Sequence, residues 1–213
     1  MEKSSKHNKI LDALQELLED QEIQKISMND IANRAGIGKS SIYYYFPSKD
    51  AIIDSLIERD YKKSLETATS LAKEIEMSPF TRMSMIFQAC RKSSTEFLNQ
   101  NKTKIIGKNL SKSPQDQALI HQKYLKYIIT ELKPVLTEIM KQGIENGEIE
   151  FDYPEQLAEL CLIILAVKLN NVLIPSTPFE IEQMIRALIK LLEKGTNTPV
   201  GSLDYMIDIY SET

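Results

Sequence analysis

The sequence predicts an all-α protein in which a small N-terminal domain precedes a larger helical one. Glycine makes up only 7 of the 213 residues, and none lies between Gly38 and Gly107. Valine, which favours strands, occurs only four times. Apolar residues instead recur at helical spacing along most of the chain. This pattern is typical of long helices, whereas a β-fold would need many more turns.

Three short helices are expected at the N-terminus. An apolar stripe predicts the first over residues 10–20. Ser27 followed by Asp30 is a capping pattern that begins a second helix, and the glycines at 36–38 end it. A third helix covers residues 39–46, because a proline follows and cannot continue it. These helices form the first predicted domain, residues 1–48.

Residues 49–213 form the second predicted domain, which we expect to be helical throughout. Ser48 caps its first helix, Pro134 kinks or breaks a long central helix, and Gly195 is the expected C-cap of the last clear stripe. The predicted helices cover residues 49 to just before Pro79, 79–101, 104–110, 115–144, 157–174 and 181–195, with a short helix within 203–210.

Composition excludes several classes of protein. The longest apolar run is Leu160–Val167, eight residues, against about 20 needed to span a bilayer, so no membrane partner is expected. The N-terminal residues lack an apolar signal core, which predicts a cytoplasmic protein. Cys90 and Cys161 are the only cysteines and have no metal-ligand spacing, so we expect no metal and no cofactor. No catalytic motif is found, and we expect no enzyme.

Charge is distributed unevenly along the chain. The net charge is −4, which by itself argues weakly against nucleic-acid binding. The stretch from residue 33 to residue 49, however, holds Arg34, Lys39 and Lys49 with no acid. Because binding depends on the local distribution of charge, this stretch predicts a basic tip on a nearly neutral domain.

The spacing within residues 28–46 predicts a helix-turn-helix. Ala32 is small enough for two helices to cross closely, and Gly36 tolerates the positive φ of a tight turn. Facing Ile42 towards the core leaves four residues of the third helix outward, which we expect to face DNA. These are Ser40, Ser41, Tyr43 and Tyr44.

The fuller string is similar to the signature of the tetracycline-repressor (TetR) family of bacterial regulators. The resemblance is carried by residues 27–32 (SMNDIA) and 35–50 (AGIGKSSIYYYFPSKD). The sequence departs from the usual family pattern at Gly38, where Ser is usual, at Ser40, where Gly is common, and at Tyr44, where His is frequent. The resemblance implies that the first predicted domain, residues 1–48, is a DNA-binding head. In it, Tyr43 and, just after it, Lys49 would contact mostly phosphates, and the start of the third helix would contact bases. The implied DNA contacts are Ser27, Lys39, Ser40, Ser41, Tyr43, Tyr44 and Lys49.

A second, shorter resemblance lies at residues 143–149 (GIENGEI), which look like the turn that many family members carry before their penultimate helix. The two apolar C-terminal helices suggest a four-helix interface between two copies, the family's usual arrangement. A two-fold homodimer would read a palindromic operator in double-stranded DNA. The alternative is that both helices only complete the core of a monomer. The expected dimer residues are Leu157, Ile164, Lys168, Ile181, Ile185, Leu188 and Leu192.

A small-molecule effector site is expected among the central helices, as the resemblance implies, although most candidate residues could equally be ordinary core. The candidates are Phe87, Cys90, His121, Tyr124, Tyr127, Ile128, Cys161 and Leu165.

The sequence as a whole therefore predicts a ligand-responsive transcriptional regulator. We expect a repressor that a small, largely apolar effector releases from its operator. The alternative function is an all-helical interaction module whose N-terminal hairpin binds a protein and not DNA. Salt-dependent affinity for DNA would distinguish the two.

Overall fold

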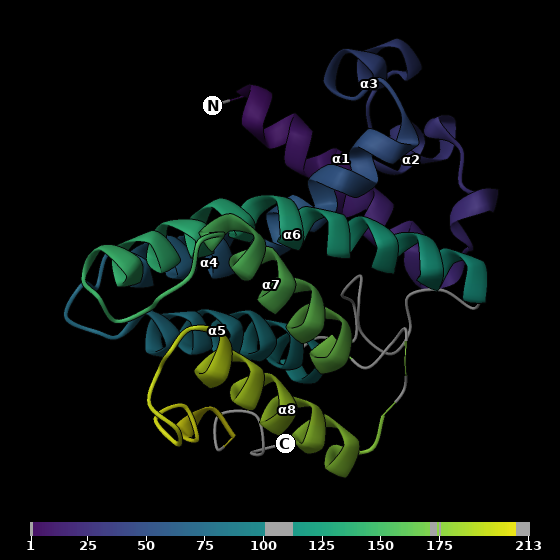
Figure 1. Cartoon of the computed structure of the whole chain (residues 1–213). Coiled ribbons are helices and arrows are strands. Elements are labelled where there is room, and N and C mark those ends of the chain that lie inside the picture. Colours follow the sequence, from purple (N-terminus) through teal and green to yellow (C-terminus); the bar gives the residue numbers. More distant parts are fainter. Residues whose placement is uncertain (1, 101–112, 171–173, 175, 208–213) are drawn as a thin grey trace. The chain divides into compact units, whose positions relative to one another are not determined.

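The protein is described by a computed structural model that covers residues 2–100, 113–170, 174 and 176–207. All regular elements in these ranges are helical, which confirms the all-α class (Figure 1). The predicted helix over residues 104–110 lies outside the described residues. The helices are α1 (Glu2–Asp20), the 3-10 turn η1 (Ile23–Lys25), α2 (Met28–Arg34), α3 (Lys39–Tyr45), α4 (Lys49–Leu71), α5 (Pro79–Gln100), α6 (Pro114–Glu145), α7 (Pro154–Asn170) and α8 (Pro178–Gly195).

The chain forms two compact units. Unit 1 comprises Met1–Lys62 with Ser94–Tyr127, and unit 2 comprises Lys63–Ser93 with Ile128–Thr213. Helices α4, α5 and α6 therefore contribute residues to both units. The predicted division of the chain after residue 48 stays a prediction.

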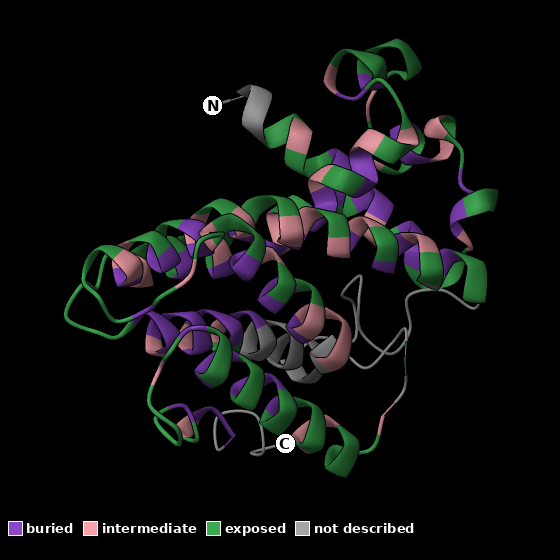
Figure 2. Ribbon diagram, viewed as in Figure 1, coloured by how far each residue is buried: buried purple, intermediate pink, exposed green. Residues whose placement is uncertain are grey.

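Unit 1 is built around the apolar stripes of its short helices. Ile10 and Leu14 of α1, Ile31 of α2 and Ile42 of α3 are fully buried, and Ile52 of α4 joins them. Figure 2 shows the buried residues of α1 gathered where this helix passes beside α4. The buried stripe that predicted each helix is therefore the stripe that holds unit 1 together.

Helix α1 begins at Glu2, eight residues before the predicted start at Ile10. No Gly or Pro interrupts this stretch, so nothing in it opposes helix formation. The ring of His7 also packs on Phe46, with centroids 4.6 Å apart. The basic N-terminal stretch is thus a helical extension of α1 that reaches the end of α3.

Unit 2 has an apolar core in which the cation Arg82 is also buried. Arg82 of α5 is 1% exposed and donates two hydrogen bonds, to the Ala72 carbonyl at 3.0 Å and to Gln142 Oε1 at 2.6 Å. Burial lowers the pKa of the Arg82 guanidinium, and the charge of Glu148 opposes this. Arg82 thereby joins the end of α4, α5 and α6 within the unit.

Pro134 lies inside α6, so of the two predicted outcomes, a kink or a break, the break does not occur. Helices α7 and α8 begin three residues before their predicted starts, at Pro154 and Pro178. The C-cap of α8 is Thr196 and not Gly195, which is the last helical residue. The left-handed conformation after α8 is taken by Asn197, with φ of 54°, because a short polar side chain tolerates that region nearly as well as glycine.

Candidate nucleic-acid interface

The turn between α2 and α3 has the geometry of a helix-turn-helix. Ser27 and Asp30 form a capping box, in which the Asp30 amide donates to Ser27 Oγ and Asp30 Oδ2 accepts from the Ser27 amide at 2.8 Å. The Ser27 hydroxyl, which donates to the same Asp30 oxygen at 2.6 Å, and the Ser27 amide together lower the pKa of Asp30. Gly36 takes φ of +67°, and the Ile37 amide donates back to the Ala32 carbonyl at 3.0 Å. A side chain at position 36 would be strained there, which explains the glycine.

Helix α3 presents its polar residues outward. Ile42 is fully buried and Phe46 is 3% exposed, whereas Tyr43 is 51% and Tyr44 71% exposed. Ser40 and Ser41 are also exposed, as is Lys39. The N-cap is Gly38, with no side-chain hydrogen bond, as its departure from the family pattern implies. Two tyrosines beside two short hydroxyls form a surface that can approach base edges and phosphates closely.

Lys49 has a different position from the other implied DNA contacts. It is half-buried, and its ammonium donates to the backbone carbonyls of Ile23 and Ile26, the latter at 2.6 Å. Two of its three hydrogens therefore tie the start of α4 to η1 and the residue that follows. Only the third remains to reach a phosphate, so Lys49 also has a structural role within unit 1.

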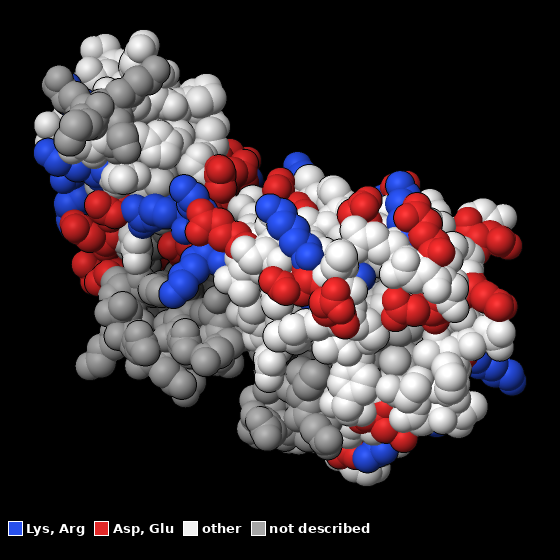
Figure 3. Space-filling view, turned by 90° about the vertical axis from the view of Figure 1, so that its left-hand side faces the viewer, with Lys and Arg blue, Asp and Glu red and all other residues white. Residues whose placement is uncertain are grey.

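Two cations of unit 1 are paired with acids. Arg34 of α2 pairs with Glu16 of α1 at 3.1 Å, which partly neutralises it. Arg59 of α4 pairs with Asp12 at 2.6 Å. On the face that Figure 3 draws, Lys and Arg alternate with Asp and Glu without a large field of one sign. That the positive charge for DNA is concentrated within residues 33–49 stays a prediction.

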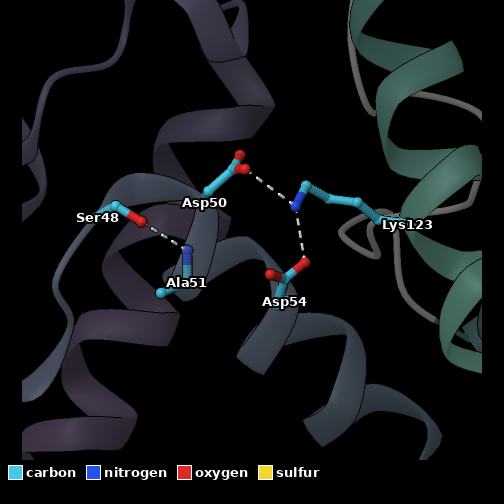
Figure 4. Close-up of polar contacts among 5 residues, drawn as sticks. All are labelled: Ser48, Asp50, Ala51, Asp54 and Lys123. Atoms are coloured by element: carbon cyan, nitrogen blue, oxygen red, sulfur yellow. Dashed lines mark hydrogen bonds and ion pairs between the residues drawn. The ribbon is translucent and has the colours of Figure 1, made fainter.

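Helix α6 holds the head through two polar contacts within unit 1. Asp116, 1% exposed, accepts the Ile23 amide through Oδ2 at 2.6 Å. Lys123 lies between Asp50 and Asp54 of α4, at 3.3 and 2.8 Å (Figure 4). Burial lowers the pKa of Lys123, but the hydrogen bonds and charges of the two aspartates outweigh it and raise the pKa. Figure 4 also shows Ser48 capping α4 through the Ala51 amide, as the sequence predicted.

Sequence reasoning did not find Asp116 or Lys123. Asp116 is 93 positions from the amide that it accepts, so no local pattern marks it. Asp116 holds η1 and Lys123 holds the start of α4, and neither residue lies on α3.

The predicted effector residues divide between the two units. Phe87, Cys90, Ile128, Cys161 and Leu165 are buried in unit 2, whereas His121 and Tyr124 are buried in unit 1 and Tyr127 is half-buried there. Burial raises the pKa of both thiols to about 12, so they are un-ionised near neutral pH. Within unit 1, His121 and Tyr124 have ring centroids 6.3 Å apart. That these residues form an effector site stays a prediction.

An open groove that the sequence did not predict lies between α6 and α7 in unit 2. Its volume is about 580 Å³, and its walls include Pro134 and Thr137. Lys133 bridges Glu155 and Glu159 across it, both at 2.8 Å. Hydrogen bonds from Lys133 lower the pKa of Glu155. The bridges join the two helices at the edge of the groove.

Four of the expected dimer residues are buried within the chain itself. These are Leu157, Ile185, Leu188 and Leu192, all at most 6% exposed. Their side chains fill the interior of unit 2, and a part for them in a dimer stays a prediction. Ile164, Lys168 and Ile181 are half-buried. The large apolar side chains that α7 and α8 expose are Leu160, Ile163, Phe179, Met184 and Leu191.

Among the described residues, no helix is long and apolar enough to cross a membrane. The same part of the chain holds no group of three or more His, Cys, Asp or Glu side chains arranged to bind a metal ion.

The fold and the turn between α2 and α3 define a helix-turn-helix protein with a helical second region. Comparison with known proteins makes this more specific. Residues 10–56 match the family described as "Bacterial regulatory proteins, tetR family". Over these residues the match confirms the resemblance to the TetR family inferred from the sequence.

Known relatives match over part of the chain. The HTH-type transcriptional regulator EthR of Mycobacterium tuberculosis is 44% identical over 50 residues. That alignment covers 24% of this chain and 23% of the relative, so the chain spans about a quarter of the relative's length.

Solved structures resemble the chain over a longer range. A TetR/AcrR-family regulator from Thermobifida fusca has a TM-score of 0.53 at 22% identity, covering 85% of this chain and 95% of that one. RolR in complex with resorcinol has a TM-score of 0.55 at 13% identity, covering 100% and 96%. At these identities the likeness shows the fold, including the helical region after the head.

Proposed function

We propose that the protein is a DNA-binding transcriptional regulator, acting as a homodimer on a palindromic operator. The observation that carries the proposal is the exposed face of α3, where Tyr43, Tyr44, Ser40 and Ser41 lie outward while Ile42 anchors the helix. The positive-φ turn at Gly36 fixes the helix that presents this face. The family match over residues 10–56 supports the same function.

A homodimer is supported by the apolar side chains that α7 and α8 leave exposed. Leu160 is 55% and Leu191 69% exposed, and Phe179 is 68% exposed. Large exposed apolar side chains are typical of interfaces between copies of a chain when they gather on one face. A two-fold dimer presents two copies of α3 and therefore reads two half-sites, about one helical turn of DNA or a multiple apart.

Release by a small, largely apolar effector completes the proposal. It is supported by the fold neighbour RolR, whose structure contains resorcinol. Any effector that weakens DNA binding must itself bind less tightly to the DNA-bound protein, typically by about 1–3 kcal/mol. Repression relieved by the effector is the proposed direction of control.

The DNA contact is tested by selecting bound duplexes from a random pool at two salt concentrations. A Ser40→Asp, Tyr44→Ala variant removes the proposed contacts. A Ser70→Asp, Tyr153→Ala variant makes the same changes at two exposed positions of unit 2 and serves as the matched control. The parent and the control should enrich the same palindrome, with weaker retention at high salt. Equal enrichment by all three proteins, or none by the parent, would contradict the proposal.

The dimer is tested by measuring molar mass in solution. A Leu160→Arg, Leu191→Arg variant should be a folded monomer, because two charges would have to be buried at the interface. A Val200→Arg variant, at a position 85% exposed outside α7 and α8, should remain a dimer. A monomeric parent would show that the exposed apolar side chains serve another purpose.

A further inference from the structure

His121 of α6 is buried in unit 1 and has no hydrogen-bond partner among the residues that the structure describes. Its side chain is 3% exposed, and neither Nδ1 nor Nε2 has a partner within the described residues. It lies on the buried face of α6 beside Ile120 and Tyr124, which are 3% and 6% exposed. Burial lowers the pKa of the imidazole, which favours the neutral ring.

A neutral imidazole has one N–H donor and one acceptor nitrogen. Leaving both unpaired away from water opposes folding, because their hydrogen bonds to water are lost and nothing replaces them. An apolar side chain of similar volume would not carry this cost. The position is therefore suited to recognising a group that arrives later and provides the missing partners.

Aromatic rings extend from His121 across two helices of the same unit. Tyr124 lies 6.3 Å from His121, and Tyr61 of α4 lies 4.7 Å from Tyr124, both measured between ring centroids. Tyr61 is 2% exposed, so this row is buried. Flat aromatic rings beside the polar imidazole favour a flat ligand with a polar substituent.

We propose that His121 recognises the effector and that the effector is an uncharged, ring-containing molecule with at least one hydroxyl group. The hydroxyl would donate to the unprotonated ring nitrogen of His121, and a second polar group or a water molecule would accept from the other. A carboxylate cannot donate, and its charge would be costly to bury. The inference deepens the proposed function and rests on it for the role of the ligand as an effector.

The first experiment needs no ligand. A His121→Leu substitution removes both unpaired nitrogens at nearly constant volume, so the ligand-free protein should become more stable. Its Tm should rise by at least roughly 2–4 °C, which is the shift expected when the cost of even one unpaired group is removed from a chain of this size. A lower Tm would mean that His121 makes structural hydrogen bonds, which overturns the proposal.

The second experiment uses three matched probes: 2-naphthol, its methyl ether 2-methoxynaphthalene, and 2-naphthoate. Binding is followed by the rise in Tm of the full chain, without DNA. The naphthol should bind the parent roughly tenfold more tightly than the ether, about the effect of one hydrogen bond to a buried partner. The naphthoate should bind least. In the His121→Leu variant, the naphthol and the ether should bind equally.

Three outcomes would overturn the proposal: no binding of the naphthol to the parent, equal binding of naphthol and ether, or discrimination that survives in His121→Leu. Operator release is measured separately with the same probes. If the naphthol binds as expected but the parent retains no DNA, the regulator function fails while the ligand site stands. If the parent retains DNA but binds no probe preferentially, the ligand site fails while the regulator function stands.

Discussion

Two glycines of the same turn allow the geometry of the DNA-reading head to be tested directly. Gly36 and Gly38 both have open space where a Cβ would be placed, with no atom within 4 Å. They differ in backbone conformation, since Gly36 has φ of +67° and Gly38, the N-cap of α3, has φ of −66°. Alanine at each position therefore isolates the effect of the backbone from that of packing.

The expected free energies follow from that difference. An L-residue in the left-handed region costs about 1–2 kcal/mol, offset by about 0.4–1 kcal/mol because alanine restricts the unfolded chain. Gly36→Ala should thus destabilise the protein by about 1 kcal/mol. Gly38→Ala has no strain, and the loss of a good N-cap residue roughly cancels the gain from the unfolded state. Its stability should be nearly unchanged.

Both variants are compared with the parent by urea unfolding, followed by circular dichroism at 222 nm. Protein concentration is kept fixed, because the stability of an oligomer depends on it. Affinity for the selected operator should fall for Gly36→Ala, because its strained turn displaces α3. The affinity of Gly38→Ala should be unchanged. A Gly36→Ala protein as stable as Gly38→Ala would refute the assignment of this turn.

Three further results are expected. Gly143→Ala should lower the free energy of unfolding by about 1–3 kcal/mol, because its Cβ would lie 2.5 Å from Pro79 Cγ. Gly195→Ala, with open space around it, should be neutral or stabilising. Equal urea midpoints for the two variants would contradict this reasoning. Asp116→Ala should cost about 1–3 kcal/mol by leaving the buried Ile23 amide unpaired, and Asp116→Asn, which keeps an acceptor, should cost less in the same assay. The two buried thiols, with pKa values of about 12, should react with a thiol reagent at pH 8 only after unfolding in urea; rapid reaction of the folded protein would show an accessible thiolate.

The head was predictable because its signals are local. The Ser27 cap, the glycine of the turn and the proline after α3 each act within a few residues, and the structure confirms the cap and the turn. Local signals also located most helices of unit 2. They failed at Gly195 because the preference for glycine at a helix end is statistical, and Asn197 takes the left-handed conformation instead.

Contacts between distant residues left no such signal. Asp116 and Lys123 are ordinary charged residues of a long helix until the fold places them beside the Ile23 amide and the two aspartates of α4. The unpaired state of His121 is equally invisible in the sequence, since a histidine on an apolar face is usually satisfied by a neighbour.

The expected dimer residues show why a periodic apolar stripe does not reveal which chain covers it. Ile185, Leu188 and Leu192 form a strong helical stripe, and the stripe correctly indicates a buried face. Periodicity says that a face leaves water, but not whether the same chain or a second copy covers it. In α8 the chain covers that stripe itself, and the apolar residues outside the stripe, Phe179 and Leu191, stay exposed. Where a helix has apolar residues on both faces, the regular stripe belongs to the protomer core and the remaining apolar residues are the better guide to assembly.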